Sequence, residues 1–254
     1  MRVCNSGHVV TPWTMAVEFG WRPTVKFFGV REAVLVDMED RQAFEGFIWG
    51  ADDVSLRLGR FEAIRVGTAG ATYWIGSPKR DLENVRATVN SFVERMVPKS
   101  IGITRIELQC LSPLSEDPVV AQGSFTTDLF AEHEKGTAAI DSALLVDGRC
   151  GRLHALFQTE YGVVSEDEIA RRLSGQGRLT PVLPMPVEAD LADLPHCSLF
   201  SRWFWHSIES PESDWQSTQI LVDEILIETT KMCEQVVNRH RLRPLQSDAM
   251  KEQA

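Results

Sequence analysis

The stretch Ser198–Ile208, with the sequence SLFSRWFWHSI, decides how the fold of this chain is read. In a strand, successive side chains point to opposite faces of the sheet. One face then carries Leu199, Ser201, Trp203 and Trp205, and the other carries Ser198, Phe200, Arg202, Phe204 and His206. Each aromatic side chain left in water forfeits about 1.5–3 kcal/mol of burial free energy. The stretch therefore predicts a central strand covered on one face by helices and on the other by the other half of the chain or by another subunit.

Two other interpretations of this stretch stay open. In the first, Trp203 and Trp205 wall a ligand pocket and Arg202 or His206 supplies its polar group, because ligand pockets are mostly apolar with a few convergent polar groups. In the second, the aromatic side chains form an exposed interface, because Trp and Arg dominate interaction hot spots. An open cavity beside the strand would favour the pocket.

The longest helix of the chain is predicted after this strand, from Asp214 or Trp215 to Asn238. Most of its apolar residues fall within one wide arc at about 100° per residue. Ile220 and Ile227 lie on the far side of the same helix. This second apolar spot indicates a helix that is covered on more than one side.

The first half of the chain has a similar order of strands followed by a helix. Alternating apolar residues predict a hairpin over residues 53–66 that turns at Gly59–Arg60, and a further strand that ends at Gly76. Apolar residues at helical spacing then predict a helix that starts at Ser77–Pro78 and ends before Pro98. A strand over residues 101–111 follows, and we expect the polar residues Glu107 and Gln109 to face solvent.

Local patterns predict four more elements. Val34, Val36 and Met38 alternate in a strand over residues 27–38, and a short helix follows from Asp40 to Trp49. The dipeptide Asp147–Gly148 is typical of a hairpin turn, here between residues 142–146 and 152–161. Ser165 and Glu168 form a capping box at the start of a short helix.

These elements predict an α+β protein with two related antiparallel sheet–helix halves and a long C-terminal helix. The halves are residues 1–117 and residues 118–254, and a single compact domain is the alternative. A chain of 254 residues buries a sizeable core without disulfides or a structural metal.

The net charge of −10 argues against general nucleic-acid binding, because Lys and Arg contacts with phosphates supply most non-specific affinity. A basic run near the C-terminus is a local exception, with Arg239, Arg241 and Arg243. Its simpler interpretation is a basic helix end that complements the helix dipole. Its alternative is a contact for nucleic acid.

Cysteine usage and hydropathy indicate a soluble, cytoplasmic protein. The five cysteines are scattered and lack the CxxC spacing of a metal or redox motif, so free thiols are expected. The start of the sequence lacks the apolar core of a secretory signal, and no apolar run has the ~18 residues of a membrane span. Common nucleotide-binding, metalloprotease and hydrolase motifs are absent from the sequence, so we expect no cofactor, no metal site and no catalytic residues.

The order of elements over residues 53–66 and 81–114 resembles a broad, uncharacterised family of sporadically distributed prokaryotic proteins of about this length. Members have a hairpin, a helix and then a strand that leads into the second half, and they tend to end in a long helix. The resemblance implies no site residues. Patchy occurrence implies an accessory system, such as a mobile element or phage defence. We therefore expect a non-enzymatic binding or assembly subunit that binds a protein partner or associates with itself.

Overall fold

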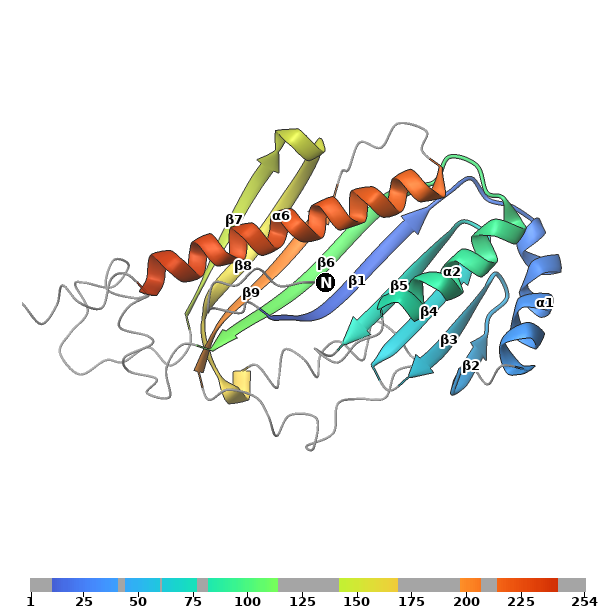
Figure 1. The fold of residues 1–254 in the computed structure, drawn as a ribbon, viewed down its shortest axis with the longest axis horizontal. Coiled ribbons are helices and arrows are strands. Elements are labelled where there is room, and N and C mark those ends of the chain that lie inside the picture. The colour runs from blue at the N-terminus through green and yellow to red at the C-terminus, as the bar shows by residue number, and fades with distance from the viewer. Residues whose placement is uncertain are drawn as a thin grey trace, which may run out of the picture.

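The computed structural model describes residues 11–40, 44–59, 61–76, 82–113, 142–168, 197–206 and 214–241. Within these residues, nine strands form one antiparallel sheet in the order β2-β3-β4-β5-β1-β6-β9-β8-β7 (Figure 1). The strands are β1 (Thr11–Gly20), β2 (Gly46–Trp49), β3 (Asp53–Gly59), β4 (Glu62–Gly67), β5 (Gly70–Gly76), β6 (Gly102–Pro113), β7 (Ser142–Cys150), β8 (Ala155–Ser165) and β9 (Cys197–His206).

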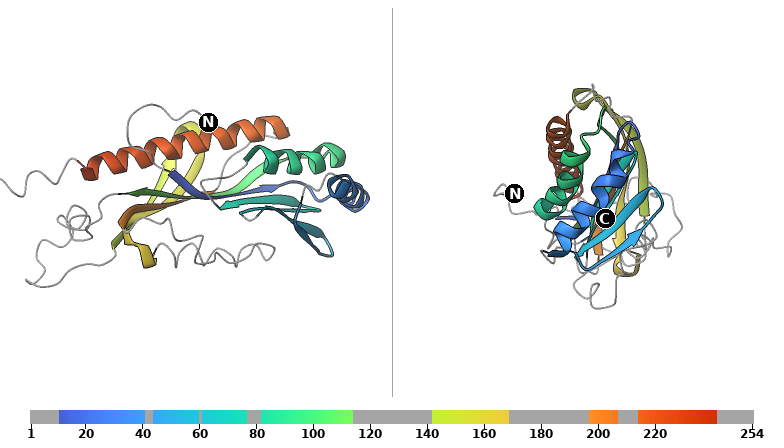
Figure 2. Two further views of the ribbon diagram at one scale, coloured as in Figure 1. Left: turned by 60° about the horizontal axis from the view of Figure 1, so that its bottom comes forward. Right: turned by 90° about the vertical axis from the view of Figure 1, so that its right-hand side faces the viewer.

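Within the described residues, three long helices accompany the sheet. They are α1 (Lys26–Asp40), α2 (Leu82–Met96) and α6 (Trp215–Arg241), and a short 3-10 helix, η1 (Gly151–Leu153), joins β7 to β8. Helices α2 and α6 lie on the same face of the sheet, and α1 lies beside α2 near the β2 edge (Figures 1 and 2). The predicted α+β class and the long last helix are confirmed. The relation between the two halves stays a prediction, and the boundary at residues 117 and 118 lies outside the described residues.

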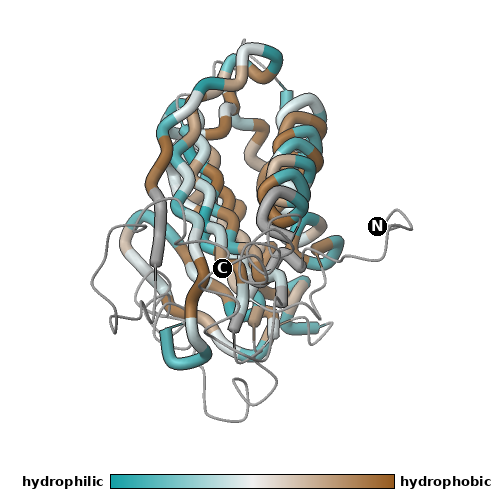
Figure 3. The backbone as a smooth tube through the Cα atoms, turned by 90° about the vertical axis from the view of Figure 1, so that its left-hand side faces the viewer, coloured by the Kyte–Doolittle hydropathy of each residue, from teal (hydrophilic) through white to brown (hydrophobic). Residues whose placement is uncertain are grey.

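The core lies between the sheet and these helices. Strands supply alternate apolar residues to it, and apolar and polar segments alternate along the strands and along α6 (Figure 3). The largest side chains that are fully buried include Tyr73, Phe27, Phe92, Ile106 and Trp205. No helix in the described ranges is long and apolar enough to cross a membrane.

Strand β9 is a central strand, as predicted, and pairs with β6 and β8. Its residues Leu199, Ser201, Trp203 and Trp205 are all buried on the face that α6 covers. On the opposite face, the burial of the side chains decreases along the strand from Ser198 to His206. Ser198 and Phe200 are buried there, Arg202 and Phe204 are half-buried, and His206 is exposed. The expectation of full cover on both faces is therefore wrong at the His206 end of the strand.

The strand predicted over residues 27–38 is wrong, because this segment is helix α1. Two periodicities overlap here. Phe27, Val34, Leu35 and Met38 follow helical spacing and are the residues that the structure buries, whereas Val36 of the alternating set is exposed. Packing against α2 decides between the two patterns, and an Arg95–Asp37 ion pair joins these helices.

The helix predicted from Asp40 to Trp49 is also wrong. Helix α1 ends at Asp40, and Gly46–Trp49 is strand β2, which pairs in register with β3. The four residues Gly46–Trp49 are too few for a stable helix, whereas they suffice for a short edge strand.

The predicted turn at Asp147–Gly148 is a continuous part of β7, where Asp147 pairs with Gln158 across the ladder. The chain turns instead at η1, and His154 adopts the left-handed conformation with φ 47°. Gly148 serves packing, because a Cβ atom there would lie 2.2 Å from the ring of Phe157. A glycine is needed at position 148 because the Phe157 side chain approaches the backbone closely, and not because the chain turns there.

Other local predictions are confirmed. The hairpin over residues 53–66 is β3 and β4, and the helix predicted before Pro98 is α2. The Glu168 backbone N–H donates to Ser165 Oγ at 3.4 Å, which is one of the two hydrogen bonds of the predicted capping box. The expected starting pair Ser77–Pro78 lies outside the described residues.

Tyr73 lies where the sheet meets both α2 and α6. Its hydroxyl is buried beside Arg86 of α2, and Arg86 Nη2 donates to Asp223 Oδ1 of α6 at 2.6 Å. Burial raises the pKa of Tyr73 from 10.0 to about 12, while the Arg86 charge opposes this shift. The folded state therefore favours the neutral phenol.

The stability of the protein should fall between pH 10 and pH 12 because of Tyr73. The unfolded phenol ionises near pH 10, whereas the folded phenol keeps its proton up to about pH 12. This contribution is complete below pH 10, and about 2–3 kcal/mol of unfolding free energy is lost as the pH rises through the window. Urea unfolding of the wild-type protein and of Tyr73→Phe at pH 9 and 11.5 measures it. Equal losses in the two proteins would contradict the assignment.

Candidate functional site

The two tryptophans singled out by sequence, Trp203 and Trp205, are core residues beneath α6. The Trp205 indole N–H donates to Thr229 Oγ1 of α6 at 2.9 Å. The Phe157 ring of β8 contacts both indoles, with centroid distances of 5.6 Å to Trp203 and 5.1 Å to Trp205. The two side chains therefore fill space between the sheet and the long helix.

Arg202 and His206 lie on the opposite face of β9, so the structure does not bring them to the tryptophans. Arg202 reaches instead toward β6, where its Nε donates to Glu107 Oε1 at 2.7 Å. Arg105 Nη2 donates to the other carboxylate oxygen, Oε2, at 2.8 Å. His206 is exposed at the end of the strand and pairs in register with Arg105. Arg202 thus belongs to a structural network.

Glu107 and Gln109 are buried on this face, and the expectation that they face solvent is wrong. The Gln109 side-chain N–H lies 3.4 Å from Glu107 Oε1, which already accepts from Arg202. The ring of Phe204 lies below both guanidinium groups, 4.4 Å from that of Arg202 and 5.1 Å from that of Arg105. Both carboxylate oxygens accept hydrogen bonds from arginine, and the network therefore joins β6 to β9 on this face.

The predicted basic cluster lies at the end of α6. Arg239 and Arg241 belong to its last residues, and Arg243 lies outside the described residues. A cationic helix end complements the helix dipole, as the simpler interpretation states. Contact of these residues with nucleic acid stays a prediction.

The structure has an exposed apolar surface at the β2 edge that the sequence patterns do not predict. Four large side chains are exposed there: Phe28 by 43%, Phe47 by 54%, Ile48 by 45% and Trp49 by 45%. We call these four residues the β2 surface. The segment GFIWG contains three consecutive large apolar residues between two glycines. Such a short run, too brief for a helix, is the signal that identifies an apolar edge strand.

Arginine and aromatic contacts hold the β2 surface in a defined shape. The guanidinium of Arg31 lies 4.0 Å from the ring centre of Trp49, and its Nη1 donates to the Gly50 carbonyl at 3.0 Å. The rings of Phe47 and Trp49 meet edge to face at 6.3 Å. These contacts therefore hold the exposed rings of Phe47 and Trp49 in place in the absence of a partner.

Strand β2 also offers backbone groups. Among the described strands it pairs only with β3 and forms one end of the sheet. An edge strand leaves alternate N–H and C=O groups without a strand partner, which makes it a template for a further strand. Phe47 and Trp49 lie on one side of β2 and Ile48 lies on the other, so apolar side chains flank this edge on both sides.

A scan against protein-family models and a search of curated proteins found no match to this chain. Its function is therefore inferred from its residues and their contacts.

Proposed function

We propose that this protein is a non-enzymatic binding subunit that docks a partner protein at the β2 surface. The observation that supports this proposal is the gathering of four exposed apolar side chains around an edge strand. Apolar side chains scattered singly over a surface are normal, whereas clustered ones mark interaction sites. Burying a side chain of this size releases about 1.5–3 kcal/mol.

The partner that fits best is an extended segment that adds a strand beside β2. Main-chain hydrogen bonds then supply affinity, and pockets for alternate side chains supply specificity. Because apolar residues flank β2 on both sides, a strand with apolar residues at successive positions would be covered on both of its faces. The ordered rings of Phe47 and Trp49 lower the entropic cost of docking, since they are held before binding.

The resemblance to a sporadically distributed prokaryotic family supports a subunit of an accessory system, such as a mobile element or phage defence. The partner is a different protein in this proposal. Sedimentation over a range of concentrations distinguishes it from a second copy of this chain, because self-association through β2 would rise with concentration and would be lost in a β2 variant.

Phe47→Lys should weaken partner binding strongly without unfolding the protein. The charge must be desolvated when a partner covers the edge, so we expect at least a tenfold loss of affinity. Its side chain is already 54% exposed, so the unfolding free energy should change by no more than about 1 kcal/mol. The measurement is affinity purification from the native host, followed by titration of the recovered partner against both proteins.

Ile220→Lys on α6 is the matched control, because Ile220 is 55% exposed and far from β2 in sequence. It introduces the same charge and should retain the partner. Equal losses in both variants, or wild-type affinity in Phe47→Lys, would refute docking at the β2 surface.

A further inference from the structure

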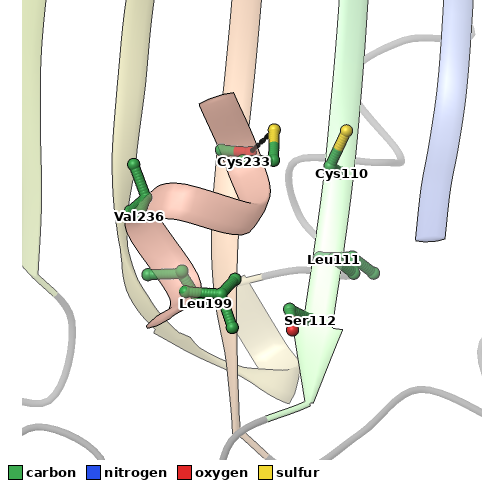
Figure 4. A pocket seen from close by; sticks show the side chains of 8 residues that line it. Cys110, Leu111, Ser112, Leu199, Cys233 and Val236 are labelled. Carbon is green, nitrogen blue, oxygen red and sulfur yellow. Dashed lines mark hydrogen bonds between the residues drawn. The ribbon is translucent and has the colours of Figure 1, made fainter. Parts of the chain in front are cut away.

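Two cysteines meet in the core beneath α6, although the sequence separates them by more than a hundred residues. Cys110 lies on β6 and Cys233 lies on α6, and both are buried free thiols. Figure 4 shows Cys233 on the helix and Cys110 on a strand of the sheet, both among the residues that line one crevice. This pair has no part in the β2 surface.

The fold places the pair through register and helical spacing. Cys110 is directly opposite Ser201 in the β6–β9 ladder, and both face the long helix. Cys233 follows Val222, Ile225 and Thr229 on the buried stripe of α6. The turn of α6 that contains Cys233 therefore lies over the Cys110–Ser201 pair.

Hydrogen bonds converge on the Cys233 sulfur. It interacts with the Cys110 thiol, and it lies 3.4 Å from Ser201 Oγ. The buried indole N–H of Trp203 is a third polar group near this sulfur. These donors, the Cys110 thiol foremost, lower the pKa of Cys233 although burial opposes them. Such donors favour the thiolate, which is the nucleophilic form of cysteine.

A crevice leads to the sulfur atoms. Its lining includes Cys110, Ser112, Ser201, Cys233, Leu199 and Val236, and the surface that it exposes is almost wholly apolar (Figure 4). It is narrow, with room for about one water molecule. An oxidant close to water in size, such as hydrogen peroxide, therefore suits it better than a larger one.

We propose that Cys110 and Cys233 form a peroxide-sensitive dithiol that closes to a disulfide and fastens α6 to β6. The oxidant is a hydroperoxide. The Cys233 thiolate attacks one peroxide oxygen, the O–O bond breaks and hydroxide leaves, which gives a sulfenic acid. The Cys110 sulfur then attacks the Cys233 sulfur, the S–O bond breaks, and hydroxide leaves and takes the Cys110 proton as water. Overall, two thiols and one H2O2 give one disulfide and two water molecules.

The disulfide changes the attachment of the long helix. It closes a loop from residue 110 to residue 233, and long loops gain the most from a cross-link in the chain-entropy description. The last part of α6 is then tied covalently to the middle of the sheet. The protein thus has a reduced form in which α6 is held by packing and an oxidised form in which it is held by a bond.

Peptide mapping of the full chain tests this proposal without any substitution. The reduced protein is treated with a small excess of H2O2, blocked with a maleimide in denaturant, and digested without a reductant. We expect a linked pair of peptides that contains Cys110 and Cys233, with two hydrogen masses fewer than the two free peptides and reversible by dithiothreitol. We also expect a rise in Tm of roughly 5–15 °C on oxidation.

Cys150 supplies the internal control, because it is a described free thiol on β7 and should remain available to maleimide. Cys150→Ser should keep the rise in Tm, whereas Cys110→Ser should lose it. Maleimide labels on both Cys110 and Cys233 after oxidation would overturn the proposal. So would a disulfide that joins Cys233 to a different cysteine, or a separate sulfinic acid at each residue.

Discussion

Trp205→Ala is expected to lower the unfolding free energy by about 3–5 kcal/mol, the range measured for large aromatic residues deleted from cores. Trp205 is 0% exposed, so the truncated side chain leaves a cavity between β9 and α6. The substitution also removes the donor to Thr229 Oγ1, although Thr229 keeps its own bond to the Ile225 carbonyl. Urea unfolding of the purified variant measures the loss, and poor expression in folded form would agree with it.

Trp49→Ala is the matched control for this deletion, because it removes the same atoms from a side chain that is 45% exposed. We expect a loss of about 1 kcal/mol or less, largely from the stacking of Arg31 on the indole. If the two variants lost equal stability, Trp205 would not have the core role described above. If Trp205→Ala were nearly neutral, the indole would line open space, as the pocket interpretation requires.

Arg202→Met is expected to cost about 2–4 kcal/mol of unfolding free energy. Glu107 is only 4% exposed, so the loss of Arg202 leaves a buried carboxylate with Arg105 as its remaining cation. Glu107→Gln should cost less, about 1–2 kcal/mol, because the side chains of Arg202 and Arg105 are 32% and 39% exposed and water can solvate them. Methionine keeps most of the apolar length of Arg202 over Phe204.

A double-mutant cycle with Glu107→Gln and Arg202→Met separates the pair energy from these single effects. The double variant should be more stable than the sum of the two losses predicts, because removal of both partners leaves no buried charge unpaired. Additive losses would show that the two groups do not stabilise each other. A more stable Arg202→Met than Glu107→Gln would contradict the burial order of the two groups.

Long periodic segments are the part of the fold that the sequence predicts well. Alternation in SLFSRWFWH locates β9, and the helical stripe after Asp214 locates α6, because burial of one face imposes a clear period on many residues. A segment in which two periods overlap is not predicted reliably. Over residues 27–38 a strand pattern and a helix pattern coexist, and only the packing of α1 on α2 selects the helix.

Contacts between strands also explain why the candidate sites were hard to predict. Alternation along a strand shows which side chains share a face, but it does not show whether other residues cover that face. The burial of Glu107 is therefore not predicted, and its partner Arg202 comes from a strand far along the chain. The two cysteines meet only through the β6–β9 register and the docking of α6. The β2 surface is not predicted, because the sequence pattern places GFIW at the end of a helix whereas the structure has it as strand β2.

Site-specific photocrosslinking in the native host tests the docking of a partner strand most directly. A benzophenone amino acid at Ile48 lies on the exposed edge strand, and one at Ile220 lies on α6 at similar exposure. We predict that Ile48 gives one discrete adduct, mapped to an extended apolar segment of another protein, and that Ile220 does not give this adduct. The account would be contradicted if Ile48 gave no adduct, or if both positions captured the same proteins.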